Sequence, residues 1–391
     1  MNEKSTLRLL YLGFALPDDV AAKHPHWNSA GQGFESALLK SLACGCEIQS
    51  ISLTSFYSKF DCEKRENDSI VLLDEKNGRV ENFNNLLQRY RQYVGQFGEF
   101  EYVMVYNLSP VYNKFIKWLR SQSKRPKLIL LLADSAQLGE SLSWAKRFRY
   151  QFKPWVWLDE AMLPCFDAAI CLSPHAVEVF CDKTRGPALW MPGAVSLETT
   201  PPEFAPPKHS DNAPCLGYFG SLSAYSGILD FAHMFLSINT PFRLEVRGDG
   251  RQSVEIRKLA EASSGRLKYH SFEGGPSDAV RMAQERWDIL LNPRRSLYGN
   301  RNNFASKIFQ YTLVGRPILT TTNSGEEEVL GKNGFFFQSD FTEADLSKVL
   351  AELLEKRSDW AAIASAAFAH TQKNYNWSGQ AERIVDFLKS V

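Results

Sequence analysis

The strongest constraint on the fold of this 391-residue chain is an alternation of short apolar segments with helix-forming segments. This alternation occurs in two separate series, one in each half of the chain. In the first half, apolar runs of strand length end at turn residues, and segments with apolar residues three or four apart lie between them. We expect strands at 7–14, 47–53, 101–106, 128–133 and 168–172, and helices at 31–42, 83–93 and 111–120. Strands that alternate with helices predict a mainly parallel sheet covered on both faces.

A proline-rich stretch separates this series from a second one. Pro192-Gly193 is followed by proline pairs at 201–202 and 206–207, a stiff and polar composition typical of a link between domains. A chain of 391 residues also exceeds what one core usually supports. We therefore predict an α/β fold of two Rossmann-like domains, 1–195 and 196–372, facing each other across a cleft. In the second domain we expect strands at 215–219, 244–247, 267–272, 289–292, 318–321 and 335–337, and helices at 227–236 and 277–286.

Charge and cysteine content exclude several classes of function. The formal net charge is +1, from 45 basic and 44 acidic residues, so no overall field favours nucleic acid as a partner. The first residues lack the apolar stretch of a signal peptide, and the seven cysteines are irregularly spaced, which favours a cytoplasmic protein with reduced thiols. No apolar run reaches the roughly 20 residues of a membrane span. We find no metal-ligand spacing and expect neither a metal nor a cofactor.

The segment 302–317 carries the start and stop signals of a short helix. Asn302 or Asn303 is suited to cap its start, and a glycine followed by a proline is suited to end it. Lys307 falls in or near the first turn, where the helix dipole disfavours a cation unless an anion is bound nearby. Gln310 follows at i+3 on the same face. This face is therefore a predicted phosphate-binding surface.

This segment and the strand after it resemble the donor-nucleotide region of GT-B fold glycosyltransferases of the family-4 type. The resemblance rests on Ala305-Ser-Lys-Ile-Phe-Gln-Tyr followed by Val314-Gly-Arg-Pro-Ile-Leu-Thr-Thr. It implies that Lys307 contacts the donor diphosphate, and that Gln310 replaces a glutamate that holds the ribose hydroxyls. The family's pair of glutamates falls on Asn302 and Gln310, so amides stand in place of both carboxylates. Amides bond hydroxyl groups more weakly than charged acceptors do.

The resemblance extends to further segments of the chain. Leu216-Gly-Tyr-Phe-Gly220-Ser221 resembles the strand and turn that open the donor domain, without the two cations that many members carry there. Arg294 is therefore a candidate to offset the phosphate charge, with a solvated surface arginine as the alternative. The last segment, 373–391, resembles the helix that returns to the first domain. The donor-binding candidates are Gly31, Gly33, Gly220, Ser221, Arg247, Gly248, Gly274, Arg294, Asn302, Asn303, Lys307, Gln310 and Glu326.

Several of these candidates have plainer interpretations. Gly31 and Gly33 lie at the start of the predicted helix 31–42, where backbone N–H groups can approach a diphosphate, but the same residues suit an ordinary helix start. Arg247-Gly248 can be a tight turn between a strand and a helix. Glu326 lies in a run of acidic residues, which is most often a solvated face.

Two features of the first domain bear on the acceptor. Asp134 ends the apolar strand at 128–133, where an α/β sheet presents side chains to its crevice. The family commonly has a histidine or an aspartate near this position, so the resemblance implies a catalytic role for Asp134 beside Lys307. A helix cap is the alternative for Asp134. The segment 143–158 interleaves basic and aromatic residues, which suits peripheral contact with an anionic membrane surface. The alternatives there are a packed helix with a solvated basic face and a surface for single-stranded nucleic acid, which stacks on aromatic rings.

The resemblance predicts a hexosyltransferase that moves a sugar from a nucleotide-diphosphate donor to a hydroxyl acceptor, in the assembly of cell-surface polysaccharides or glycoconjugates. A UDP-sugar is the expected donor and a GDP-sugar the next, with a lipid-linked glycan among the acceptors considered. Family membership implies retention at the anomeric carbon and no metal requirement. Two alternatives remain: a catalytically silent subunit that binds nucleotide sugars, and a sugar-nucleotide epimerase on the same fold.

Overall fold

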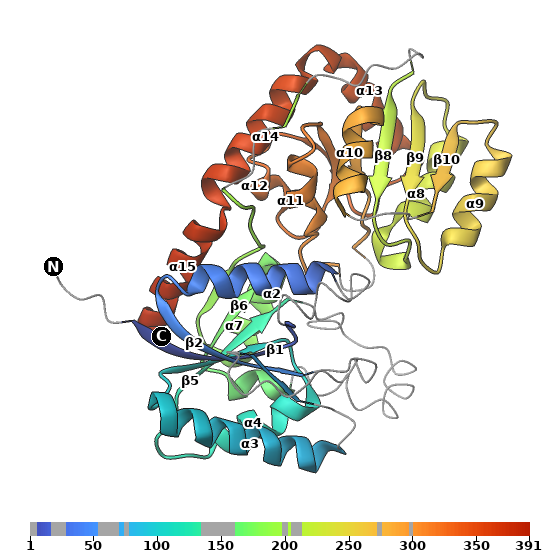
Figure 1. The fold of residues 1–391 in the computed structure, drawn as a ribbon. Coiled ribbons are helices and arrows are strands. Elements are labelled where there is room, and N and C mark those ends of the chain that lie inside the picture. The colour runs from blue at the N-terminus through green and yellow to red at the C-terminus, as the bar shows by residue number, and fades with distance from the viewer. Residues whose placement is uncertain are drawn as a thin grey trace. The chain divides into compact units, whose positions relative to one another are not determined.

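The computed structural model describes residues 6–16, 29–53, 70–73, 78–133, 161–197, 202–204, 213–271, 276–296 and 300–391. The chain divides into two compact units, one of Met1–Met191 with Trp377–Val391 and the other of Pro192–Asn376. Each unit is built on a parallel sheet with helices on its faces (Figure 1). Asp134, Gly274 and the segment 143–158 lie outside the described residues.

The first unit contains a seven-stranded sheet in the order β3-β2-β1-β4-β5-β6-β7. All of its strand pairs are parallel, and β1 and β4 pair at its centre, with Leu9 opposite Tyr102. The strands are β1 (Leu7–Gly13), β2 (Cys46–Leu53), β3 (Ile70–Leu73), β4 (Tyr102–Tyr106), β5 (Lys127–Leu132), β6 (Ala168–Cys171) and β7 (Ala188–Trp190). The helices are α2 (Ser29–Leu42), α3 (Gly78–Phe97), α4 (Pro110–Arg120) and α7 (Pro174–Thr184).

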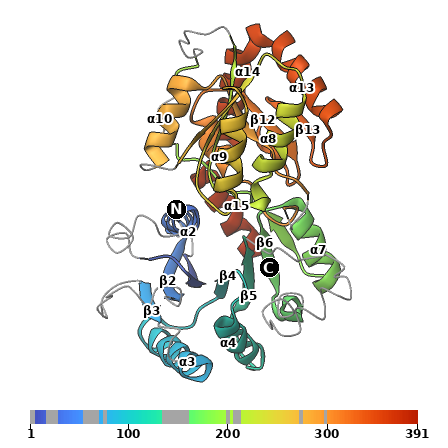
Figure 2. The same ribbon diagram turned by 90° about the vertical axis from the view of Figure 1, so that its right-hand side faces the viewer.

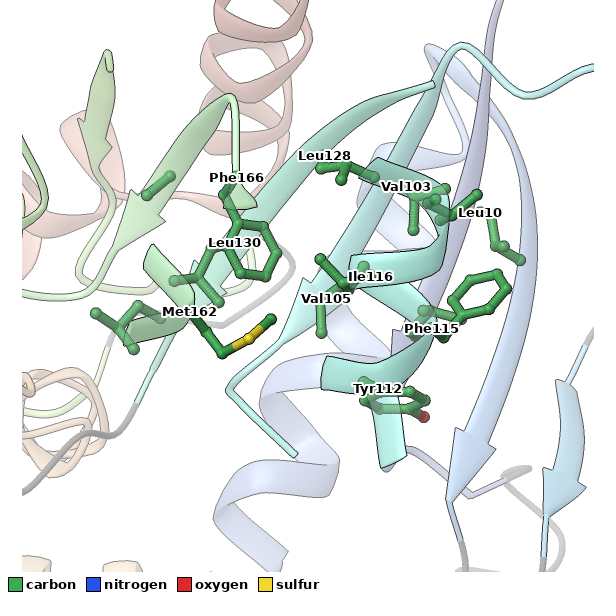
Figure 3. Close-up of a cluster of buried hydrophobic side chains, with 14 of the residues drawn as sticks. Leu10, Val103, Val105, Tyr112, Phe115, Ile116, Leu128, Leu130, Met162 and Phe166 are labelled. Carbon is green, nitrogen blue, oxygen red and sulfur yellow. The ribbon is translucent and has the colours of Figure 1, made fainter. Parts of the chain in front are cut away.

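Apolar side chains between this sheet and helix α4 form the core of the first unit. Val103 and Val105 of β4 face Phe115 and Ile116 of α4, and all four are fully buried (Figure 3). Helix α3 lies next to α4 and adds Tyr90, whose ring centre is 5.4 Å from that of Phe115 (Figure 2). The strands have almost wholly apolar sequences because a parallel sheet is buried on both faces.

The last helix of the chain, α15 (Trp377–Ser390), belongs to the first unit. It packs against α2, where the ring centres of Trp377 and Phe34 are 5.5 Å apart. The Tyr102 hydroxyl in β4 donates to the Leu388 carbonyl at 2.7 Å. The chain therefore leaves the first unit after β7 and contributes its final helix to the same unit.

The second unit contains a six-stranded sheet in the order β10-β9-β8-β11-β12-β13, again with parallel pairs. The strands are β8 (Cys215–Phe219), β9 (Arg243–Arg247), β10 (Leu267–His270), β11 (Ile289–Asn292), β12 (Ile318–Thr322) and β13 (Phe335–Gln338). The helices are α8 (Ile228–Ser237), α9 (Ser253–Ala262), α10 (Pro276–Arg286), α11 (Lys307–Thr312), α12 (Glu326–Val329), α13 (Glu343–Glu355) and α14 (Trp360–Asn374). Two parallel sheets of this kind confirm the predicted α/β class.

Trp287 shows how the sequence sets the packing of the second sheet. A Cβ at Gly217 in β8 would lie 1.9 Å from the indole of Trp287, so the strand needs a glycine for the ring to pack flat against it. The indole nitrogen donates to the buried carboxylate of Glu245 in β9 at 3.1 Å. Trp287 thereby joins the end of α10 to the neighbouring strands β8 and β9.

None of the described helices combines the length and the apolar composition needed to cross a bilayer. The prediction of membrane contact concerned the segment 143–158, which is outside the described residues.

Candidate functional site

The candidate site lies in the second unit, where β8 and β11 end as neighbours in the sheet. β8 leads into the turn 220–226, and β11 leads into the loop that carries Arg294 and the residues 300–306 before α11. The carboxyl ends of strands form the ligand-binding edge of an α/β sheet at the point where the strand order reverses. Both segments therefore reach the edge at which a ligand is expected.

Helix α11 is shorter and starts later than its sequence signals predict. It spans Lys307–Thr312, and Ser306 before it makes no side-chain capping hydrogen bond. The prediction that Asn302 or Asn303 caps this helix is therefore wrong. The Asn303 side chain instead accepts a hydrogen bond from Arg294. Because a helix of six residues supplies only a small dipole, anion binding here depends on side chains rather than on the helix end.

Lys307 directs its ammonium group toward the turn after β8. Its Nζ donates to the Tyr218 hydroxyl at 2.8 Å and lies 4.0 Å from the centre of the Tyr218 ring. Gly220 gives it room, because a Cβ at that position would lie 3.0 Å from Nζ. Burial, and then the positive charge of Arg294, lower the pKa of Lys307 to about 7. No carboxylate among the described residues offsets the charge of Lys307.

Tyr218 contacts this ammonium group through a hydroxyl that accepts one hydrogen bond and donates another. It accepts from Lys307 and donates to the Ser221 carbonyl at 2.8 Å. Burial raises the pKa of Tyr218 above its usual range, so the phenol keeps its proton. Tyr218 is not among the site residues predicted from the sequence. The available signal was its place two residues before Gly220, at the carboxyl end of a strand.

Arg294 connects the two segments of the site. It is 8% exposed and donates to the Asn300 side-chain oxygen at 2.6 Å as well as to Asn303. Asn300 in turn donates to the Tyr225 carbonyl at 2.9 Å and to the Arg295 carbonyl at 2.7 Å. The hydrogen bond from Asn300 to Tyr225 therefore connects the loop after β11 to the turn after β8. Arg294 is not the solvated surface arginine of the alternative interpretation.

Asn302 lies in the same loop and is 1% exposed. Neither the oxygen nor the nitrogen of its side-chain amide has a hydrogen-bond partner among the described residues. Buried polar groups in native structures are nearly always bonded, and an unpaired one costs about 1–3 kcal/mol. Asn302 is therefore a position at which a ligand can complete the hydrogen bonding of the protein.

Close backbone packing brings the turns after β8 and β9 together. The Gly220 N–H donates to the Arg247 carbonyl at 3.0 Å. A Cβ at Gly248 would lie 1.9 Å from the Gly220 carbonyl oxygen, so the two turns touch at glycines. Ser221 follows and is exposed, with its carbonyl bonded by Tyr218. Four of the donor-binding candidates thus lie together at one edge of the sheet.

Two other candidates lie on helices of the second unit. Gln310 is exposed on α11. Glu326 is fully buried, and its carboxylate accepts from the N–H groups of Asn323 and Ser324 at 2.9 and 2.7 Å. Glu326 therefore stabilises the turn before α12 by these hydrogen bonds, and it is not the solvated charge of the alternative interpretation.

Helix α2 of the first unit begins two residues earlier than expected and contains both Gly31 and Gly33. The helix predicted from residue 31 is therefore confirmed, and contact of Gly31 and Gly33 with a diphosphate stays a prediction. Further along α2, the Glu35 carboxylate accepts from the Tyr11 hydroxyl at 2.9 Å and from the Phe14 N–H at 3.0 Å. Burial raises the pKa of Glu35 to about 7. Glu35 is not among the residues predicted from the sequence, although it is a single acidic residue in an otherwise uncharged half of the helix.

The groups assembled in the second unit are suited to binding anions and hydroxyl groups. Lys307 and Arg294 supply positive charge, and Asn302 supplies one donor group and one acceptor that have no partner in the part of the chain that the structure describes. Among the residues that the structure describes, no three His, Cys, Asp or Glu side chains gather in the way that metal ligands do.

The sequence of the second unit matches a known family. Residues 213–356, which include Tyr218, Arg294, Asn302 and Lys307, match the family described as "Glycosyl transferases group 1". A comparison with curated protein sequences found no match.

The fold of the whole chain is similar to those of solved structures. Sucrose-phosphate synthase from Thermosynechococcus elongatus has a TM-score of 0.66 at 12% identity, over 98% of each chain. The lipopolysaccharide outer core galactosyltransferase WaaB, in its apo form, has a TM-score of 0.68 at 12% identity, over 98% of this chain and 100% of that one. Anabaena HepE in complex with UDP and glucose has a TM-score of 0.62 at 13% identity, over 98% and 100%. With the family match, these likenesses confirm the predicted resemblance to GT-B glycosyltransferases.

Proposed function

We propose that this chain, which carries a glycosyl transferases group 1 domain on a GT-B fold, transfers a sugar from a nucleoside-diphosphate donor to a hydroxyl acceptor. The observation that carries the proposal is the ammonium group of Lys307, which is held by Tyr218 at the ligand-binding edge of the sheet without an offsetting carboxylate among the described residues. The complex of Anabaena HepE with UDP and glucose supports a donor of this class, with a UDP-sugar as the first candidate and a GDP-sugar as the next.

The proposed chemistry depends on the charge that develops when the sugar leaves. Breaking the bond between the anomeric carbon and the diphosphate places negative charge on a phosphate oxygen. A bound diphosphate favours the charged form of Lys307, because an opposite charge within about 4–6 Å raises the pKa of an ammonium group. Lys307 would then stabilise the leaving diphosphate from a fixed position, which requires little reorganisation during the reaction.

The side chains of Asn302 and Gln310 would hold the hydroxyl groups of the donor. Asn302 is the better placed of the two for the sugar, because its buried amide lacks both of its hydrogen-bond partners among the described residues. Gln310 is exposed on α11, three residues beyond Lys307, and we assign it to the ribose. Asp134, the catalytic residue proposed for the acceptor side, is outside the described residues.

The test is single-turnover release of nucleotide from a panel of UDP-, GDP- and dTDP-sugars. Lys307→Ala is expected to weaken donor affinity by about 1–3 kcal/mol, the scale for losing a charge-assisted hydrogen bond. Lys348→Ala, which changes an exposed lysine of α13 in the same unit, serves as the matched control and should leave donor affinity unchanged. Equal donor affinity in the two variants would remove Lys307 from the site and would contradict the proposal.

A catalytically silent subunit that binds nucleotide sugars is the second candidate function. The observation that favours it is the pair of amides at Asn302 and Gln310, which bind hydroxyl groups less strongly than carboxylates. Tight donor binding without release of nucleotide, in the presence of a broad set of hydroxyl acceptors, would support the silent subunit. A changed sugar on the intact donor, in the absence of acceptor, would instead indicate an epimerase.

A further inference from the structure

The carboxyl end of strand β1 lies where a ligand of the first sheet is expected. The strand order reverses between β1 and β4, because β2 and β3 lie on one side of β1 and all later strands lie on the other. Ligands of an α/β sheet bind at the carboxyl ends of the strands at such a reversal. The backbone from Phe14 to Leu16, which follows β1 directly, is therefore at the ligand-binding edge of the first sheet.

Two side chains of helix α2 hold this backbone segment. The Glu35 carboxylate accepts from the Phe14 N–H at 3.0 Å. One turn earlier in α2, the Gln32 amide accepts from the Leu16 N–H at 2.7 Å and donates to the Leu16 carbonyl at 2.8 Å. The segment has no regular secondary structure, so side chains of α2 supply hydrogen bonds that a sheet or a helix would otherwise supply.

The last residue of β1 is held from both faces of the sheet. Helix α2 covers one face, and α4 covers the other (Figure 1). From α4, the Tyr112 hydroxyl donates to the Gly13 carbonyl at 2.7 Å. From α2, Glu35 comes so close that a Cβ at Gly13 would lie 2.2 Å from its Oε2. A glycine at the end of β1 therefore allows the carboxylate to reach the segment.

Glu35 is a buried acid that titrates near neutral pH. It is 2% exposed, and burial raises its pKa to about 7. The N–H groups of Phe14 and Ala15 lower this pKa by less than burial raises it. No basic residue among the described ones contributes to it. The negative charge of Glu35 is therefore stabilised by neutral donors alone within the described residues.

The titratable groups around Glu35 are phenols. Tyr11 of β1 donates its hydroxyl to the carboxylate at 2.9 Å. Burial, and then the charge of Glu35, raise the pKa of Tyr11 well above its ordinary value, so this phenol keeps its proton. Tyr106 from β4 and Tyr112 from α4 are further titratable side chains next to Tyr11. Near pH 7, the charge of this cluster therefore changes through Glu35.

We propose that Glu35 is a positioning residue for the proposed transfer, and that together with Gln32 it fixes the backbone of residues 14–16 at the ligand-binding edge of the first sheet. The inference rests on the proposed function and adds a residue that acts through the backbone. Ionised Glu35 accepts from every donor that faces it, whereas the protonated carboxyl presents an O–H donor of its own to them. The segment is therefore held best above pH 7.

The experiment measures the maximal rate of nucleotide release between about pH 6 and pH 8.5, with the full-length protein saturated with a nucleotide sugar. The sugar is the one, among the UDP-, GDP- and dTDP-sugars, from which the wild-type protein releases nucleotide. We expect the wild-type rate to fall below pH 7, by up to about tenfold per pH unit, as Glu35 takes up a proton.

Glu35→Gln is the main variant, because an amide resembles the protonated carboxyl at every pH. We expect its rate at about pH 8 to be at least tenfold below that of the wild type, the scale on which a displaced group slows a reaction, with no fall below pH 7. Its donor dissociation constant should be unchanged, because the proposed donor contacts lie in the second unit. Glu47→Gln, the same change at an exposed residue of β2, is the matched control and should keep the wild-type rate and profile.

Thermal melting separates positioning from simple stabilisation of the fold. The pKa of Glu35 in the folded protein lies above its ordinary value, so the stability contributed by the protonated form is lost as the pH rises towards 7. Glu35→Gln carries no buried charge and should melt at the same temperature as the wild type, or higher, at about pH 8. A residue that only stabilises the fold would instead lose melting temperature and rate together.

Gln32→Met is a second variant, which removes the bonds to Leu16 and leaves Glu35 in place. Its rate should be lower than that of the wild type, and it should still fall below pH 7. Wild-type rates in both variants, a fall below pH 7 that persists in Glu35→Gln, or a lower melting temperature of Glu35→Gln above pH 7 would overturn the inference and leave the proposed function intact. Absence of nucleotide release by the wild-type protein from every sugar tested would contradict the proposed function, and the inference with it.

Discussion

The ammonium nitrogen of Lys307 lies 2.8 Å from the hydroxyl oxygen of Tyr218, 89 residues earlier in the chain. The same hydroxyl donates its proton to the Ser221 carbonyl, so its oxygen lone pairs face Lys307. A neutral hydroxyl stabilises an ammonium ion less than a carboxylate would. The cation is therefore held in place while its charge remains available to an anion.

The pKa of Lys307 predicts a specific pH dependence of donor binding. Its value in the unliganded protein is about 7, and a bound diphosphate would raise it. Donor affinity should then be greatest below pH 7, where Lys307 is already protonated. Above pH 7 it should weaken, by up to about tenfold per pH unit, as binding requires uptake of a proton. Calorimetry with a nucleotide sugar between pH 6 and 9 checks this, because its diphosphate does not titrate in that range.

Lys307→Arg provides the control for this pH profile. A guanidinium group keeps its charge at every accessible pH, so the variant should bind the donor with a nearly flat profile. A flat profile in the wild-type protein would show that donor binding takes up no proton, and an unchanged slope in Lys307→Arg would show that a group other than Lys307 takes it up.

Asn302 is predicted to lower the stability of the ligand-free protein and to increase its affinity for the donor. Replacing a buried, unpaired amide with a methyl group removes a desolvation cost of about 1–3 kcal/mol. Asn302→Ala should therefore leave the melting temperature of the free protein unchanged or raise it. Donor affinity should fall, because the hydroxyl that completes the amide loses its partner. Thermal melting with and without a nucleotide sugar measures both effects on one sample.

Asn300 gives a matched comparison two residues away in the same loop. It is equally buried, but its side chain bonds Arg294, Tyr225 and Arg295. Asn300→Ala should lower the melting temperature of the free protein, since it leaves these buried groups without partners. Similar losses of stability in both variants would contradict the assignment of Asn302 to a ligand.

Much of the fold follows from the sequence because a parallel sheet leaves a strong pattern. The strands β8 (Cys215–Phe219) and β11 (Ile289–Asn292) have the predicted bounds, since each is a continuous apolar run between turn residues. Helix α9 (Ser253–Ala262) was not predicted, and only Ile256 of its residues is buried. A helix that buries so little has a weak apolar stripe, and the sequence pattern does not reveal it.

The candidate site was predictable only in part. Lys307 could be found because a cation at a helix start is unusual, although the helix begins four residues later than a cap at Asn302 predicts. The partners of Lys307 and the bonds between Arg294 and Asn300 depend on tertiary structure. Spacing along the sequence does not encode such contacts, so Tyr218 was missed. The burial of Asn302, and the absence of a partner for its amide within the described segments, likewise depend on tertiary structure.

Gln310→Glu tests the assignment of this residue to the ribose. The side chain is exposed on α11, so the substitution should not disturb folding. A carboxylate accepts stronger hydrogen bonds from a diol than an amide does, and the gain should be about 1 kcal/mol in affinity for a nucleotide with an intact ribose. Binding of the matching 2′-deoxynucleotide should gain less. An equal gain for both nucleotides would contradict the contact with the ribose.

Substitutions at Gly33 and Gly95 test whether Gly33 contacts the donor, separately from the effect of each glycine on helix stability. Each lies inside a helix, in α2 and α3, and a Cβ at either position would meet no atom of the described residues within 4 Å. Gly33→Ala and Gly95→Ala should each stabilise the protein by about 0.5–1 kcal/mol, because alanine loses less backbone freedom on folding. Thermal melting should show this gain in both variants. If the backbone at Gly33 approaches the donor, only Gly33→Ala should also lower kcat/KM for the donor. Equal turnover in the two variants would show that Gly33 serves the helix alone.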